Sequence, residues 1–248
     1  MALRTFANGV LFAEILGNSP PTVLALHGWG RRGSDFAASL GGMDVLAPDF
    51  PGFGASPAPS TVMGAADYAT TIEVLLDEFT RPPLIVGHSF GGRVAVCLAA
   101  RHPGRVGALV LTGVPLVRLE AASKPRMSFR IMRSLNRVGV VSDARMEDIR
   151  RSSGSSDYRA ASGMMRDIFV KVVNESYEAE LAQLEAPTRL VWGSEDQEVP
   201  VQVAERALEI LAASGVDATL EVVTGSGHML PTQEPETLRR VVDSLMKT

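Results

Sequence analysis

The sequence holds one cysteine, Cys97, and no long apolar run among its 248 residues. One cysteine cannot form a disulfide within the chain, and nothing else in the composition indicates an oxidising compartment. No stretch reaches the 18 or more apolar residues that a membrane-spanning helix needs. The first residues also lack the apolar segment and small-residue cleavage site of a signal peptide. We therefore expect a cytoplasmic protein without a membrane span.

An excess of charge of either sign is also missing, because 24 Lys and Arg stand against 28 Asp and Glu. This balance gives the chain no general attraction to nucleic acid. The sequence has neither a Cys/His cluster nor a dinucleotide-binding loop, so we expect no metal and no organic cofactor. Hydrophobic residues, in contrast, make up 46% of the chain. A chain of this length and composition suits one domain with a single large core.

Short β-branched or Leu-rich segments alternate with segments of helical periodicity. Residues 3–7 and 10–16 flank Asn8-Gly9, a dipeptide that favours the type I′ turn of a hairpin. Further strands are predicted at 22–26, 44–47, 83–86, 106–112, 188–192 and 219–223, and helices at 65–79, 90–101, 201–213 and 234–246. This alternation predicts an α/β protein with a mostly parallel sheet covered by helices.

Residues 116–185 break the alternation, because they have helical periodicity and few strand signals. We interpret them as a helical cap inserted into a core domain formed by residues 1–115 and 186–248. The apolar residues of this cap would either line a substrate pocket or pack the cap onto the core. They are Met127, Phe129, Ile131, Met132, Leu135, Met164, Met165, Ile168 and Phe169.

Residues 87–91 read Gly-His-Ser-Phe-Gly and fit the pattern G-x-S-x-G between a predicted buried strand and a predicted helix. In that context the serine occupies a sharp, strained turn. Side chains in place of Gly87 or Gly91 would clash with the neighbouring strand and helix. The turn would hold the hydroxyl of Ser89 clear of the sheet, near a helix N-terminus that favours developing negative charge. We therefore predict that Ser89 is a nucleophile.

A serine hydroxyl needs a base to take its proton. The chain has four histidines, which are His27, His88, His102 and His228. His228 is the one in a Gly-rich loop after the last predicted strand. Such a loop can bring an imidazole to the C-terminal edge of the sheet, beside Ser89, so His228 is the predicted base.

The base in turn needs an acid that fixes its tautomer and stabilises the imidazolium. Asp196 lies just past the end of a predicted strand, at the same edge of the sheet. We predict that Asp196 orients His228, while Glu195 and Glu198 are nearby alternatives.

Two backbone N–H groups are expected to stabilise the oxyanion that forms when the serine attacks a carbonyl. The first belongs to Phe90, directly after the nucleophile. The second belongs to Trp29, in a loop that reads His-Gly-Trp-Gly over residues 27–30. Gly28 and Gly30 would let this loop turn close to the substrate.

Together these motifs resemble the α/β-hydrolase superfamily. The matching segments are residues 27–30, 49–56 (Asp-Phe-Pro-Gly-Phe-Gly-Ala-Ser), 87–92, 192–196 (Trp-Gly-Ser-Glu-Asp) and 227–228. The resemblance implies an eight-stranded sheet with an antiparallel second strand, a helical cap between strands six and seven, and the chain order Ser, Asp, His. It implies a mainly structural role for residues 49–56, without a catalytic part for Asp49 or Ser56.

The superfamily contains many reactions, and its fold alone does not choose among them. A serine nucleophile argues against haloalkane dehalogenases and epoxide hydrolases, which use an aspartate. Our leading hypothesis is a carboxylic ester hydrolase that works through an acyl-enzyme. The alternatives are a C–C bond hydrolase of ring-cleavage products, a perhydrolase-like esterase, a carrier-protein-linked methyl ester esterase, and a ligand-binding receptor. Met229 follows His228 where ring-cleavage hydrolases often have Trp, which disfavours the first alternative.

Four arginines recur at helical spacing within the predicted cap: Arg126, Arg130, Arg133 and Arg137. At this spacing they would share one face of a helix. The face is either simply solvated or a docking surface for an acidic carrier protein, a phosphorylated substrate or an acidic membrane surface. Methyl ester esterases that act on acyl-carrier-protein substrates have a basic cap of this kind.

Overall fold

A computed structural model of the chain describes residues 2–18, 20–119 and 156–247. Its strands are β1 (Ala2–Phe6), β2 (Leu11–Leu16), β3 (Val23–Leu26), β4 (Val45–Asp49), β5 (Leu84–His88), β6 (Ala108–Thr112), β7 (Thr188–Gly193) and β8 (Ala218–Val223). They form one sheet in the order β1-β2-β4-β3-β5-β6-β7-β8. β2 is antiparallel to both of its neighbours, and every other pair is parallel. The predicted fold class and the antiparallel second strand are confirmed.

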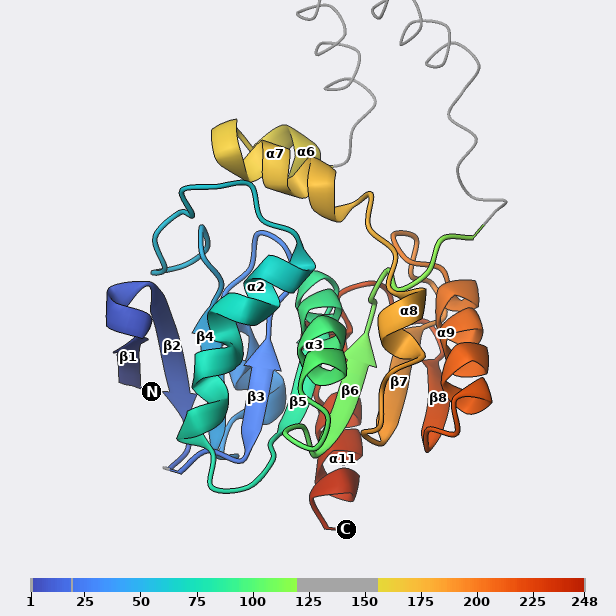
Figure 1. Cartoon of the computed structure of the whole chain (residues 1–248). Coiled ribbons are helices and arrows are strands. Elements are labelled where there is room, and N and C mark those ends of the chain that lie inside the picture. Colours follow the sequence, from blue (N-terminus) through green and yellow to red (C-terminus); the bar gives the residue numbers. More distant parts are fainter. Residues whose placement is uncertain (1, 19, 120–155, 248) are drawn as a thin grey trace, which may run out of the picture.

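Helices cover both faces of this sheet (Figure 1). Those described are α1 (Ala37–Leu40), α2 (Ala65–Ile72), α3 (Phe90–Arg101), α6 (Ser156–Ala160), α7 (Gly163–Val172), α8 (Glu178–Leu181), α9 (Val201–Ala213), α10 (Leu230–Gln233) and α11 (Pro235–Met246). The helices α2, α3, α8 and α9 pack on one face, and α1 and α11 pack on the other. None of the helices in the described ranges is long and apolar enough to cross a membrane.

The central strands are buried on both faces, which explains their continuous apolar sequence. In β3, Leu24 and Leu26 contribute to the core on the α3 side, whereas Val23 and Ala25 contribute to the core beneath α11. Successive residues of a strand point to opposite faces. Each buried strand therefore contributes side chains to two cores. A polar side chain on either face would lower the stability of the fold.

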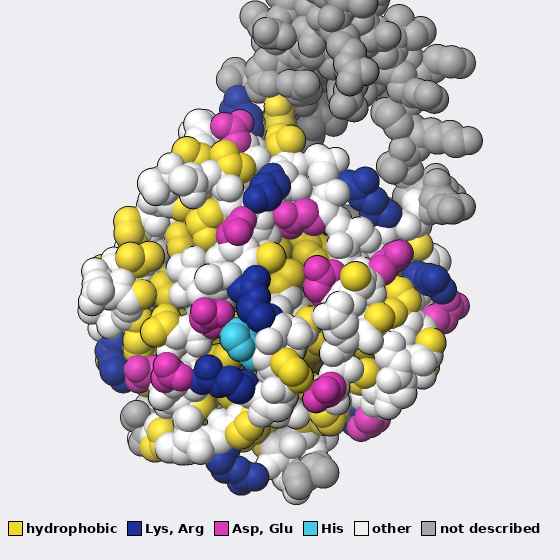
Figure 2. Space-filling model, viewed as in Figure 1, with side chains coloured by type: hydrophobic (Ala, Val, Ile, Leu, Met, Phe, Trp, Pro, Cys, Tyr) yellow, Lys and Arg dark blue, Asp and Glu magenta, His cyan; other side chains and the backbone are white. Residues whose placement is uncertain are grey.

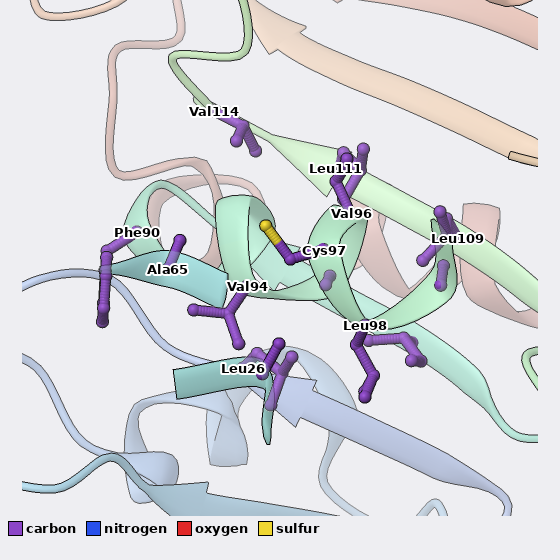
Figure 3. Packing of buried hydrophobic residues seen from close by; sticks show 14 of the residues in the cluster. Leu26, Ala65, Phe90, Val94, Val96, Cys97, Leu98, Leu109, Leu111 and Val114 are labelled. Atoms are coloured by element: carbon purple, nitrogen blue, oxygen red, sulfur yellow. The ribbon is translucent and has the colours of Figure 1, made fainter. Parts of the chain in front are cut away.

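Helix α3 is enclosed by its neighbours, as the close view of its apolar side chains shows (Figure 3). Val94, Val96 and Leu98 are fully buried, and Cys97 is 5% exposed. Burial raises the pKa of the Cys97 thiol to about 12. This cysteine therefore acts as a small core residue and not as a nucleophile.

Most predicted strands differ from the observed ones by one or two residues at their ends, and two local conformations were not expected. The predicted helix 65–79 is α-helical as α2 and continues as a 3-10 helix over Glu73–Glu78, in which Leu75 and Leu76 keep the expected apolar stripe buried. The β1–β2 turn has the expected positive φ at Asn8 and Gly9. Ala7 also has a positive φ, of 49°, which the sequence did not indicate.

The described chain between β6 and β7 is helical. Helices α6 and α7 lie beyond the carboxyl ends of the strands (Figure 1), while α8 packs against α3 and α9 beside the sheet. Ile168 and Val172 of α7 are buried in the core on the α3 side. The predicted basic face and the apolar cap residues Met127 to Leu135 lie outside the described residues. The division into core and cap therefore stays a prediction.

The face shown in Figure 2 carries basic and acidic side chains interspersed with neutral and apolar ones. Ion pairs on the described surface include Arg105 with Asp77 at 2.6 Å and Lys171 with Asp67 at 3.0 Å. Such exposed pairs contribute little to stability individually. The mixture agrees with the small net charge of the whole chain.

Candidate active site

Ser89 lies in the turn between β5 and α3, with φ 49° and ψ −113°. A positive φ is uncommon for a residue with a side chain and marks a strained backbone. The glycines around it are required by space. A Cβ on Gly87 would lie 2.6 Å from the Cα of Gly92, and one on Gly91 would collide with the carbonyl oxygen of Leu26. The predicted reason for the G-x-S-x-G pattern is thus present in the geometry.

Asp196, in the loop after β7, accepts three hydrogen bonds. One oxygen, Oδ2, lies 2.8 Å from Nδ1 of His228, in the loop after β8. The other, Oδ1, accepts the backbone N–H groups of Glu198 and Val199 at 2.9 and 2.8 Å. The Asp196 side chain is 1% exposed, whereas the alternative acids Glu195 and Glu198 are exposed. Of the three acids weighed from the sequence, Asp196 is the one that contacts Nδ1.

The imidazole of His228 is surrounded by acidic side chains. Burial alone would lower the pKa of His228, but the hydrogen bond and charge of Asp196, together with the charges of Glu198 and Asp157, outweigh it and raise the pKa above its ordinary value. The second ring nitrogen, Nε2, lies 3.6 Å from Oε2 of Glu198. This environment stabilises a proton on the ring, as a general base requires.

The other three histidines have local partners. His27 accepts a backbone N–H at Nε2, 3.0 Å away, and burial lowers its pKa to about 4. His88 donates from Nδ1 to the carbonyl oxygen of Thr112 at 3.1 Å. Burial and the neighbouring His228 lower the pKa of His88 to about 3, so this ring stays neutral. His102, which follows α3, is partly buried, and its Nε2 lies 2.9 Å from Oε2 of Glu73.

The loop over residues 27–30 lies directly beside the serine. A Cβ on Gly28 would be 3.5 Å from the Cβ of Ser89. Gly30 has φ 67°, as expected for a tight turn. Within the described ranges, no protein atom accepts the backbone N–H of Trp29 or of Phe90. Both groups are therefore free to bind an oxygen of a ligand.

Aromatic rings hold Trp29 in place. Its ring packs edge-on against Phe53, Phe90 and Phe169, with centroids 4.9, 5.5 and 5.0 Å apart. Phe169 belongs to α7, so this contact ties the loop after β3 to the helix beyond the sheet. Such edge-to-face pairs add to the stabilisation gained from burial.

Two adjoining cavities open at Ser89 and His228. The larger has a volume of about 440 Å³, and most of its wall is apolar. Phe169 is part of this wall, whereas Ile168 is buried in the core, so the apolar residues of the predicted cap include both kinds. The smaller cavity, of about 150 Å³, is more polar and is lined by Arg31 among others.

Ser89, His228, Trp29 and Phe90 all line the larger cavity, and Asp196 lies behind His228. The structure adds charged residues that the sequence analysis did not select, namely Arg93 and Asp157 in the larger cavity and Arg31 in the smaller. One signal for Arg93 was available, because it is the charged residue within the apolar first turns of α3, four positions after the serine.

Asp49 braces two loops near the site without facing the cavities. Its two carboxylate oxygens accept the backbone N–H groups of Gly33 and Ala55, each at 2.8 Å. The hydroxyl of Ser56 donates to the carbonyl oxygen of Asp49 at 2.7 Å. These bonds agree with the structural role that the sequence resemblance implied for residues 49–56.

Comparison with known proteins places the chain in a family. A model of the alpha/beta hydrolase family matches residues 23–241. A pimeloyl-acyl-carrier protein methyl ester esterase of Chromobacterium violaceum is 40% identical over 105 residues, which are 41% of this chain and 39% of that protein. The match thus spans less than half of that relative. A 2-hydroxy-6-oxononadienedioate/2-hydroxy-6-oxononatrienedioate hydrolase of Cupriavidus pinatubonensis is 27% identical over 262 residues, 91% of this chain and 86% of that protein.

A solved structure agrees in fold. The esterase EaEST of Exiguobacterium antarcticum superposes with a TM-score of 0.73 at 21% identity, over 100% of this chain and 99% of that one. These relatives are named as esterases and as a hydrolase of a different substrate class, so the similarities do not identify one reaction. Because the family model matches most of the sequence, this chain belongs to the alpha/beta hydrolase family.

Proposed function

We propose that this protein is a serine hydrolase that cleaves carboxylic esters through an acyl-enzyme. The observation that carries the proposal is the arrangement around one cavity. A serine on a strained turn and a histidine paired with a buried carboxylate at 2.8 Å line the same space. A nucleophile, a base and an orienting acid are the three parts that this chemistry needs.

In the proposed reaction, Oγ of Ser89 attacks the ester carbonyl while Nε2 of His228 takes the hydroxyl proton. Asp196 keeps the other ring proton on Nδ1 and stabilises the imidazolium. The backbone N–H groups of Trp29 and Phe90 hold the oxyanion of the tetrahedral intermediate. Its collapse breaks the bond to the alcohol oxygen, which receives the proton from His228. His228 then takes a proton from a water molecule, which attacks the acyl carbonyl of the acyl-enzyme. The bond from the acyl carbon to Oγ of Ser89 breaks, Oγ takes the proton back from His228, and the carboxylic acid leaves.

The neighbouring charges support the assignment of the base. Because His88 stays neutral beside His228, it adds no positive charge that would oppose protonation of the base. Asp196, Glu198 and Asp157 favour the protonated ring. The imidazolium formed in the first step is therefore stabilised from several sides.

We further propose that residues 116–185 form a helical cap over the core of residues 1–115 and 186–248. The placement of α7 beyond the strand ends, with Phe169 in the cavity wall, supports this division. An acidic carrier protein docking on Arg126, Arg130, Arg133 and Arg137 is a finer proposal. Its support is the spacing of these arginines together with the similarity to carrier-protein methyl ester esterases.

C–C bond hydrolysis of ring-cleavage products is the second candidate function. The similarity to such a hydrolase over 91% of the chain favours it. Met229 after the proposed base still departs from the pattern of those enzymes. Product analysis with a chromogenic ring-cleavage substrate separates the two reactions.

The first experiment compares wild type with Ser89→Ala on p-nitrophenyl esters from acetate to long acyl chains. We expect the substitution to lower kcat by roughly 10⁴- to 10⁶-fold, the usual effect of removing a serine nucleophile. Ser214→Ala, an exposed serine after α9, is the matched control and should leave kcat unchanged. Substantial turnover by a folded Ser89→Ala protein would refute the assignment.

A further inference from the structure

Arg93 is a buried cation in the wall of the larger cavity. It is 7% exposed and lies in the first turns of α3, four residues after Ser89. One helical turn advances about 5.4 Å along the axis. The guanidinium and the proposed nucleophile therefore belong to the same rigid helix and face the same cavity.

The partners of Arg93 within the protein are incomplete. Its Nη1 donates to the carbonyl oxygen of Val172, and its guanidinium carbon lies 5.8 Å from the centre of the Tyr177 ring. A hydrogen bond with the Tyr177 side chain also favours the charged guanidinium. No described atom accepts a hydrogen bond from its buried Nε. The acid whose charge acts on Arg93 is Glu175, but the two form no ion pair, and Glu175 accepts the Tyr177 hydroxyl at 2.7 Å.

A buried guanidinium in this situation is costly. Arginine stays protonated in proteins, so burying it without a carboxylate in direct contact leaves its charge only partly compensated, here by Tyr177 and the more distant Glu175. The amino end of α3 adds to the local positive potential, because the helix dipole is positive there. Burial also lowers the pKa of Arg93, a sign that the charged form is held against its solvation preference. An anion in the cavity would relieve this cost.

Two acidic side chains lie near the proposed base. Glu198 and Asp157 line both cavities, and Glu198 comes within 3.6 Å of the base His228. Arg93 lines the larger cavity and is absent from the wall of the smaller. Arg31 lines the smaller cavity together with these acids and offsets part of their charge. Among the described residues that line the larger cavity, Arg93 is the one Lys or Arg, so a negative end of a substrate in that cavity is attracted towards Arg93.

We propose that the larger cavity selects esters whose acyl chain ends in a carboxylate, and that Arg93 binds this carboxylate. A guanidinium binds a carboxylate through its planar set of N–H donors, and Arg93 is the arginine in the wall of this cavity. The acyl chain then lies along the apolar wall, with its ester carbonyl at Ser89. The product of hydrolysis is a dicarboxylate and an alcohol. This inference rests on the proposed ester hydrolysis.

The test compares the activity on charged esters with the activity on uncharged esters. Wild type, Arg93→Met and Arg93→Lys are assayed on mono-p-nitrophenyl esters of succinate, glutarate and adipate, and on uncharged p-nitrophenyl esters of equal chain length. We expect wild type to have the higher kcat/KM on the charged series. Arg93→Met should lower that kcat/KM by about 10- to 100-fold, the usual effect of losing a hydrogen bond between charged groups. The uncharged series should change by less than about threefold, because those esters do not use the guanidinium.

Two controls separate charge from structure. Arg118→Met removes a nearby exposed cation that donates to Asn174 at 3.2 Å, and it should keep the wild-type preference. Arg93→Lys keeps a charge but cannot pair through two parallel donors, so it should give an intermediate preference. If circular dichroism shows that Arg93→Met does not fold, the proposal is tested by comparing Arg93→Lys with wild type. An equal loss on both ester series would mean that Arg93 is merely structural, and an unchanged preference would also overturn the proposal.

A binding measurement distinguishes failure of this proposal from failure of the proposed function. Monomethyl adipate is titrated by calorimetry into Ser89→Ala and into the double variant Ser89→Ala with Arg93→Met. We expect at least about tenfold weaker binding to the double variant. Binding that depends on Arg93, together with no ester turnover by the wild-type protein, would keep the carboxylate site and reject ester hydrolysis. Equal binding to the two proteins would reject the site itself.

Discussion

Replacing Asp196 by asparagine tests the proposed catalytic machinery with a minimal change of shape. The asparagine oxygen can keep accepting the N–H groups of Glu198 and Val199, which Oδ1 of Asp196 accepts at 2.9 and 2.8 Å. Its amide NH₂ then faces Nδ1 of His228 at the 2.8 Å position of the carboxylate. An NH₂ group can only donate, so Nδ1 must become the acceptor and the ring proton moves to Nε2. That tautomer cannot take the proton of Ser89.

The expected size of the effect follows from this tautomer change. The corresponding substitution in a serine protease lowers kcat by roughly 10⁴-fold, and we expect a similar loss here. At about 1.36 kcal/mol for each factor of ten, it equals about 5.5 kcal/mol of activation free energy. The fold should tolerate the change, because two of the three hydrogen bonds are kept. We expect the free energy of unfolding to fall by no more than about 1 to 3 kcal/mol.

The assay combines kinetics with a direct view of the ring. Hydrolysis of p-nitrophenyl butyrate gives kcat, thermal unfolding gives stability, and ¹⁵N NMR of the histidine rings reports which nitrogen of His228 is protonated. Glu195→Gln is the matched control, since Glu195 is the exposed neighbour of Asp196. The reasoning is refuted if Asp196→Asn keeps more than about a tenth of the wild-type kcat, because a tautomer block allows no such rate.

Two further predictions concern the electrostatics of the base and the packing of the elbow. Because the pKa of His228 is raised and the base must be neutral, kcat/KM should rise with pH through a pKa above the ordinary value of 6.5. Glu198→Gln removes one of the charges that raise the pKa of His228, so the rise of kcat/KM should move to lower pH. A move of this rise to higher pH would contradict the prediction. Gly91→Ala should lower the melting temperature, because its new methyl group would be overpacked against β3 and would reduce the free energy of unfolding by about 1 to 3 kcal/mol. Gly227→Ala should leave the melting temperature unchanged, since the nearest atom to its new methyl group lies at an ordinary contact distance of 3.4 Å. Equal melting temperatures for the two glycine variants would show that the elbow is not tightly packed.

Local chemistry explains why much of the fold could be predicted from the sequence. The bounds of α3 and α9 are those expected, because each helix follows a turn and has a clear apolar pattern. The change from α-helix to 3-10 helix after Ile72 was not predictable in this way, since no glycine or proline marks it. The positive φ of Ala7 likewise has no local signal.

The candidate site likewise contains residues that the sequence indicates and residues that it does not. Ser89, Asp196 and His228 are indicated by short motifs at the carboxyl ends of strands, and the structure brings them to one region. Arg93 and Asp157 reach the cavity from α3 and α6, which are distant in the chain. Their convergence depends on how helices pack across the sheet edge. Spacing along a single sequence does not encode that packing.

The backbone of Ser89 also sets a conflict between stability and activity. At φ 49° and ψ −113° this residue occupies a conformation that glycine adopts without strain. A residue with a side chain there costs the folded state about 1 to 3 kcal/mol. Glycine at position 89 would remove the strain and the hydroxyl together. A selection for thermostability alone would therefore favour glycine at this position and remove the proposed nucleophile.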